Sequence, residues 1–213
     1  MKSVPNPHIP INALHADVRR LLKKYKCELQ LHQVRAQFMG AIASPIDQVN
    51  PMQELKSLWN GTLPAMKNMT AVSELMQVFA MGLWNHLSVH CDPDHPFELS
   101  AFSGIYSHKE IAHFAEVKGQ EIESFISGFF QRQDNLRIPT EISHSIDVLE
   151  DLIAMFKGIV NIPENHGDTE AVMRNLMEKL TQISQIAQQE INAIIVKTAQ
   201  DRLHMGTPPT TLH

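Results

Sequence analysis

The sequence is poor in residues that staple small proteins together and in motifs that carry common catalytic chemistry. Its two cysteines, Cys27 and Cys91, are too few for a disulfide framework or a four-cysteine zinc site, and they are typical of a reducing cytoplasm. The sequence contains no P-loop, no GxGxxG loop and no GxSxG nucleophile signature. We therefore expect a protein that is not an enzyme and that needs no cofactor.

A strong charge of one sign and long apolar runs are also missing. The 23 acidic and 18 basic residues give a net charge of −5, which does not steer the chain as a whole toward nucleic acid. No apolar run approaches the ~20 residues that a membrane-spanning helix needs. Residues 1–12 hold three prolines and no apolar stretch, so they do not resemble a signal peptide. These absences predict a soluble, cytoplasmic protein without a membrane or nucleic-acid partner.

Apolar residues at helical spacing, in contrast, run through most of the chain. Leu31, Val34, Phe38 and Ile42 follow one another at steps of three and four, which places them on one face of a helix. Similar stripes predict helices over residues 11–26, 28–43, 52–59, 70–92, 107–130 and 138–159, and a long last helix over 168–203. Gly119 predicts a break within its helix. No segment alternates as a strand does, so we expect an all-α, multi-helix bundle.

The long last helix decides the expected organisation of the chain. At 1.5 Å per residue, its roughly 35 residues extend about 50 Å, which is long for the core of one small domain. We expect it to pack as a hairpin on the preceding helix. In this interpretation residues 11–203 form one helical domain, with an N-terminal bundle over 11–135, a C-terminal hairpin over 138–203, and flexible ends at 1–10 and 204–213. The alternative left open is that the distal half of the last helix forms the seam of a homodimer.

Three segments of the chain form an ordered set of motifs. The first, FMGAIASP at 38–45, is an apolar helix ended by a proline, and Trp59 follows it. The second is ESFISGFF at 123–130, and the third is EISHSIDVLEDLIAMF at 141–156. In this order and spacing the three segments resemble the UPF0149 family, also called the YgfB/YecA family.

The details of the second and third motifs carry the resemblance further. Phe125 takes the place of the tryptophan in the family's Trp-x-x-Gly-Phe motif, and Gly128 and Phe129 match it. Asp151 and Leu152 match the end of its Glu-x-Leu-x-Asp-Leu helix. The chain is more similar to the YgfB branch, because it ends in TPPTTLH instead of a cysteine-rich metal motif. The resemblance implies an all-helical, dimeric bacterial protein for which no enzymatic activity is established.

The first functional hypothesis is a non-enzymatic adaptor or regulator that works as a homodimer and binds an unknown protein partner in a groove between helices. The candidate contact positions are apolar residues near the proline-marked link and in the second motif: Phe38, Pro45, Trp59, Phe125 and Phe129. The alternative is that these residues are plain core. Their substitution would then unfold the protein without separating binding from stability.

The second hypothesis is a metal- or small-ligand-binding site in the segment HLSVHCDPDH, residues 86–95. His86 and His90 are four residues apart, so both imidazoles point from one face of a helix, as a pair of metal ligands does. Cys91, Asp94 and His95 follow and complete a ligand set that suits zinc. The alternative is that the histidines are hydrogen-bonded, partly buried residues at a helix end.

A third hypothesis concerns the positive charges of the first predicted helix. Arg19, Arg20, Lys23, Lys24 and Lys26 lie within eight residues and have the chemistry to contact phosphates. In an acidic chain with few neighbouring aromatic residues, we favour a solvated helix face. Nucleic acid is therefore not the partner we expect.

Overall fold

The computed structural model describes residues 10–46, 49–101, 106–131, 133, 136, 138–162 and 169–205. Its helices are α1 (Ile11–Lys24), α2 (Leu31–Ala43), α3 (Pro51–Ser57), α4 (Met69–Met76), the π-helix η1 (Gln77–Leu83), α5 (Trp84–Ser88), the 3₁₀-helix η2 (Val89–Cys91), α6 (His108–Phe130), α7 (Thr140–Val160) and α8 (Glu170–Met205). Over these residues there is no strand, which confirms the all-α prediction. The predicted flexible ends fall outside the described residues, apart from Pro10 and the last residues of α8.

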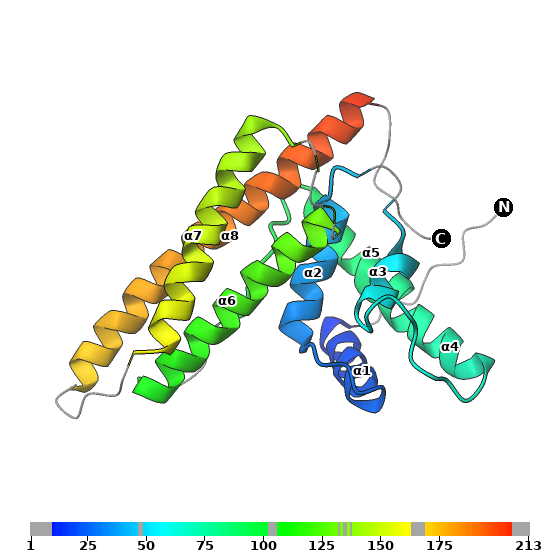
Figure 1. Ribbon diagram of the computed structural model, residues 1–213, viewed down its shortest axis with the longest axis horizontal. Helices are drawn as coiled ribbons and strands as arrows, with labels where there is room; N and C mark the ends of the chain where they lie inside the picture. Colours follow the sequence, from blue (N-terminus) through cyan, green and yellow to red (C-terminus); the bar gives the residue numbers. More distant parts are fainter. Residues whose placement is uncertain are drawn as a thin grey trace.

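The long helices α6, α7 and α8 lie side by side, and α1 to α5 gather on one side of them, next to α6 (Figure 1). α7 runs antiparallel to α8 and packs on it, so the long last helix forms the predicted hairpin with its predecessor. α6 contacts α2 as well as α7 and α8. It therefore joins the N-terminal helices to the long ones. No helix in the described part of the chain combines the length and apolar character needed to cross a bilayer.

The segment from α4 to η2 is one continuous helical run over residues 69–91, close to the predicted 70–92. Its middle, η1, is a π-helix, which the apolar pattern did not predict. α1 approaches closely here, because a Cβ added at Gly82 would lie 2.8 Å from Leu14 Cδ1. The buried face of α1, with Leu14, Val18 and Leu21, is thus held against this run.

The predicted break at Gly119 is wrong. α6 passes through Gly119 without interruption, and a Cβ at this position would make an ordinary contact with Phe156 Cβ at 3.6 Å. The helix begins where the sequence indicates, since the Ser107 hydroxyl accepts a hydrogen bond from the amide of Glu110 at 3.2 Å. A glycine inside a helix costs only about 1 kcal/mol, so neighbouring packing overrides it.

Two glycines fix the crossing of α2 and α6. A Cβ at Gly40 would overlap the carbonyl oxygen of Phe125, and a Cβ at Gly128 would overlap that of Gln37. The two backbones therefore touch at a crossing that only glycine permits on both sides. The first two motifs of the sequence, 38–45 and 123–130, meet at this crossing.

Candidate functional site

Three of the five predicted contact residues lie in the core and not on a surface. Phe38, Phe125 and Phe129 have an exposed fraction of 0%. The Phe38 ring packs on Phe79 and Trp84, with centroids 6.2 and 5.9 Å apart. Their assignment to an interaction surface is therefore corrected, because α2 and α6 bury these faces against each other and against the η1–α5 run. The alternative reading as plain core holds for these three.

The other two predicted contact residues, Trp59 and Pro45, are half-buried. The Trp59 indole Nε1 donates a hydrogen bond to the carbonyl oxygen of Tyr25 at 3.0 Å, which ties the chain after α3 to the end of α1. Pro45 follows the end of α2, where Arg202 of α8 donates to the carbonyl oxygens of Ile42 and Ser44. Both residues thus lie where segments of the fold are joined.

The predicted metal ligands are brought together only in part. The rings of His86 and His90 lie 6.0 Å apart, and His90 Nδ1 is 2.9 Å from the carbonyl oxygen of His95. The His95 ring itself turns to Asp92, with Nδ1 3.2 Å from Oδ2. Throughout the described ranges, no three His, Cys, Asp or Glu side chains are grouped so as to hold a metal ion. Partial burial, His90 and Arg35 lower the pKa of His86, so the local potential also disfavours a bound cation.

The basic residues of α1 divide into two groups with opposite surroundings. Arg20 lies 2.9 Å from a Glu74 carboxylate oxygen and 3.0 Å from Asp17, and Lys24 lies 3.1 Å from the other Glu74 oxygen. Arg19 and Lys23, one residue earlier in each case, have no carboxylate within ion-pair distance in the described part of the chain. The fold therefore neutralises one basic stripe and leaves its neighbour unpaired.

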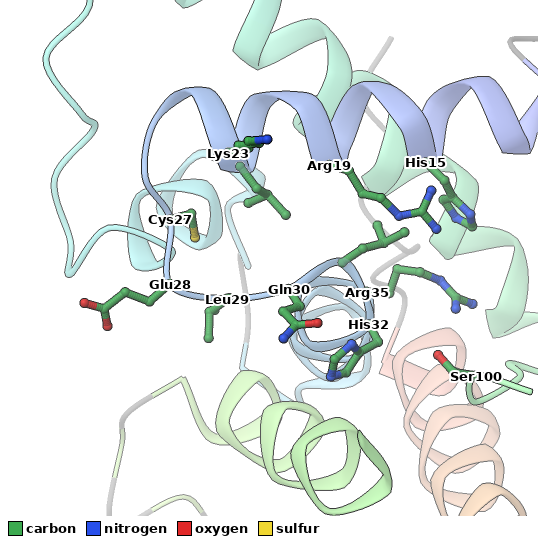
Figure 2. A pocket seen from close by; sticks show the side chains of 12 residues that line it. His15, Arg19, Lys23, Cys27, Glu28, Leu29, Gln30, His32, Arg35 and Ser100 are labelled. Carbon is green, nitrogen blue, oxygen red and sulfur yellow. The ribbon is translucent and has the colours of Figure 1, made fainter. Parts of the chain in front are cut away.

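The unpaired stripe lines a pocket of about 560 Å³ between α1, the turn at residues 25–30 and the start of α2. Figure 2 shows the polar side chains that converge there, with Arg19 turned toward His15 and with Arg35 below them. The polar lining is formed by His15, Arg19, Lys23, Glu28, Gln30, His32, Arg35 and Ser100. Glu28, the acidic member, points away from His15 and Arg19 (Figure 2).

The end of the pocket that is lined by His15 and Arg35, its inner end, contains two buried nitrogens without hydrogen-bond partners. His15 Nε2 and Arg35 Nε are both buried, and neither has a hydrogen-bond partner among the described residues. Arg35 donates from Nη2 to the carbonyl oxygen of Glu98 at 3.2 Å, and its guanidinium lies 5.3 Å from the centre of the Phe97 ring. Backbone and aromatic contacts therefore hold Arg35 in place, and no carboxylate forms an ion pair with it.

Burial and neighbouring positive charges both oppose protonation of His15. Burial, followed by the charges of Arg35, Arg19 and His86, lowers the pKa of His15 from 6.5 to about 4. Burial also lowers the pKa of Arg35, and the carboxylates of Glu121 and Glu98 offset this only in part. His15 is therefore neutral at pH 7 in surroundings that oppose further positive charge.

A buried ion pair lies next to Ser100, which lines the pocket. Lys118 and Glu121 of α6 have side chains that are 2% and 1% exposed, and they lie 2.8 Å apart. One Glu121 oxygen accepts hydrogen bonds from the Ser100 amide and hydroxyl at 2.8 and 2.7 Å, and Lys118 donates to the Ser100 carbonyl. Each Glu121 oxygen therefore has a partner, and Ser100 is held at the pocket wall.

Of the pocket residues, the sequence analysis considered only Arg19 and Lys23 as candidates for binding a ligand. The available signal is the step of four from His15 to Arg19 to Lys23, which places the three on one stripe of α1. Arg35 joins them from α2, and the sequence offers no separate signal for this pairing. The site becomes apparent only when the fold places α1 beside α2.

The chain has no match to a protein-family model, to a curated protein or to a solved structure. The resemblance to the UPF0149 family therefore stays a prediction.

Proposed function

We propose that this chain is a non-enzymatic adaptor or regulator and that it holds its partner at the pocket between α1 and α2. The observation that carries this proposal is a set of three cations without carboxylate partners in the described residues, gathered in a chain of net charge −5. Arg19, Lys23 and Arg35 provide a local positive field that attracts acidic groups. The partner is therefore a molecule that presents an anionic group.

The chemistry of the pocket lining supports binding over catalysis. Burial raises the pKa of the Cys27 thiol, and its Sγ lies 3.4 Å from the carbonyl oxygen of Leu58, so the sulfur stays protonated and is a poor nucleophile. His15, with a pKa of about 4, is a weak base at neutral pH. Arginine side chains hold anions but do not exchange protons near pH 7.

The homodimer, the bacterial origin and the cytoplasmic location are proposals as well. α8 carries exposed apolar side chains at Val172, Ile186 and Leu203, and these are the positions we assign to contacts between two copies. Sedimentation equilibrium measures the oligomeric state directly. A monomer at concentrations up to the millimolar range contradicts the dimer but leaves the partner proposal intact.

A charge-reversal comparison tests the adaptor role. The full chain and the variant Arg19→Glu/Lys23→Glu are each used to capture partners from a lysate of the native host. Lys109 of α6 and Lys179 of α8 are exposed and outside the pocket lining, so Lys109→Glu/Lys179→Glu is the matched control with the same change of net charge. We expect one protein in near-stoichiometric amount with the wild type and the control, and its loss with the pocket variant. Equal capture by both variants contradicts the proposal.

A further inference from the structure

At the inner end of the pocket, two buried nitrogens lack a hydrogen-bond partner among the described residues. A buried donor without a partner costs free energy, and a buried charge without a counter-charge costs more. Here His15 Nε2 and Arg35 Nε are buried without a hydrogen-bond partner in the described residues, and no carboxylate there forms an ion pair with Arg19, Lys23 or Arg35. Elsewhere the same chain completes such networks, as Lys118 with Glu121 and Ser100 shows. In the pocket, by contrast, the charged side chains of the lining have no ion-pair partner among the described residues and border a space that can hold a ligand.

The ligand group that best suits these side chains is an oxyanion with several acceptor atoms. Two guanidinium groups offer flat, forked sets of N–H donors, which suit the oxygens of phosphate or carboxylate. Arg19, Lys23 and Arg35 bring three positive charges to the lining, against the single charge of Glu28, which points away. Outside the lining, the Glu98 and Glu121 carboxylates act on Arg35, and Glu121 is already paired with Lys118. A carboxylate has one negative charge, whereas a phosphate monoester has nearly two at pH 7 and a third oxygen to accept hydrogen bonds. The balance of charge and donors favours the phosphate monoester.

The dimensions of the pocket favour an ester over the free ion. The volume of about 560 Å³ is in the range of small-molecule sites and is larger than a phosphate needs. Part of the lining is apolar, because Leu22, Cys27, Leu29 and Leu31 alternate with the polar residues. This part can hold the carbon atoms that carry the phosphate.

We infer that His15, Arg19 and Arg35 form a binding site for the phosphoryl group of a phosphate monoester, with Lys23 at the wall and the apolar part of the pocket holding the rest of the ligand. The inference rests on the proposed function, because the monoester is the anionic group that the partner presents. A phosphorylated side chain of a protein and a small phosphorylated molecule share this chemistry.

Ligand binding has a measurable consequence at His15. The ring faces Arg19 of its own helix, Arg35 of α2 and His86 of α5, and these groups oppose its protonation. A dianion between them reverses the local field and favours the protonated ring, which then donates from both nitrogens. We expect the titration midpoint of His15 to rise when the phosphoryl group binds.

The test uses the full chain, isothermal calorimetry and NMR of the histidine rings. The probes are phenyl phosphate, a phosphoserine peptide, inorganic phosphate and benzoate. We expect saturable binding of phenyl phosphate or the phosphoserine peptide, at least tenfold weaker binding of benzoate, and a higher His15 midpoint in the complex. The stronger of the two esters identifies the source. Inorganic phosphate binding as tightly as either ester, or benzoate binding as tightly, overturns the assignment to a monoester.

Two adjacent arginines of α1, Arg19 and Arg20, provide a test variant and its matched control. Arg19 is exposed, so Arg19→Gln leaves the fold intact and should weaken ester binding roughly tenfold, the value of one charged hydrogen bond. Arg20→Gln, one residue away and paired with Glu74, should leave it unchanged. Absence of ester binding, or equal effects of the two variants, overturns the inference. If partner capture still depends on Arg19 and Lys23 in that case, the proposed function stands with a carboxylate as the partner's anionic group.

Discussion

Toward α6, helix α2 presents Gly40, and the two backbones lie so close that no side chain fits between them. Toward α1, the same helix presents Arg35, whose buried Nε has no partner among the described residues. The face toward α6 is closely packed, and the face toward α1 borders a pocket whose cations have no ion-pair partner in the described residues. One side of this helix thus serves packing, and the other borders the pocket at which we propose binding.

Removing the buried ion pair next to Ser100 should produce the largest loss of stability. Lys118→Met leaves the Glu121 carboxylate buried without its counter-charge, which typically costs about 3–5 kcal/mol. The matched control is Lys157→Met, because Lys157 forms its ion pair with Glu123 on the surface, where both side chains are more than half exposed. That change should stay within about 0.5 kcal/mol. Urea unfolding measures both, and similar losses for the two variants would contradict the assigned role.

The glycine crossing should be nearly as sensitive. Gly128→Ala places a methyl group onto the carbonyl oxygen of Gln37, so the helices must separate, at a cost of about 3 kcal/mol. Gly119→Ala on the same helix makes only an ordinary contact and should stabilise the protein by roughly 0.5–1 kcal/mol through helix propensity. Thermal unfolding of the two variants should therefore shift in opposite directions. If the unfolding temperatures of both variants shift in the same direction, the close packing of α2 and α6 at Gly128 is contradicted.

On the pocket side, removal of a charge should have the opposite effect on stability. Arg35→Met keeps an apolar contact with Phe97 and removes a half-buried cation that has no ion pair in the described residues. We expect the free energy of unfolding to rise by about 1 kcal/mol while binding of phenyl phosphate is lost. The two readouts are urea unfolding and calorimetry. A clear loss of stability would show that Arg35 serves the core and not the pocket.

The last effect, the pH dependence of stability, is close to zero at pH 7 and grows only as the pH falls. The pKa of His15 is about 4 in the folded protein and near 6.5 in the unfolded chain, so the unfolded chain binds more protons between these values. Its contribution to stability is therefore complete above pH 6.5 and is lost as the pH falls toward 4. His15→Gln should flatten this part of the curve. Urea unfolding at pH 7 and pH 4.5 provides the slope, and an unchanged slope contradicts the burial of His15 beside Arg35.

Much of the helical framework follows from local pattern, because each helix needs only its own apolar stripe and its ends. The Ser107 cap and the hairpin of the last two long helices are of this kind. The assignment of Phe125 and Phe129 to a surface was wrong because a stripe shows that a face is buried, and not which helix buries it. The break at Gly119 was wrong for a related reason, since packing on α7 outweighs the local preference.

The pocket depends on information that no single segment contains. Arg19 and Arg20 are neighbours in the sequence, and Asp17 of α1 together with Glu74 of α4 distinguishes them by pairing with Arg20. His15 and Arg35 are twenty residues apart and become neighbours through the turn that joins α1 to α2. The sequence shows a basic helix, and the fold determines which of its faces stays charged.

The central claim is that α1 has a neutralised basic face and a face that binds an anion. The most direct test is the dissociation constant of phenyl phosphate for Arg19→Gln compared with Arg20→Gln. Our account predicts roughly tenfold weaker binding for the first and an unchanged constant for the second. Equal constants for the two variants, or no binding to the wild type, would contradict it.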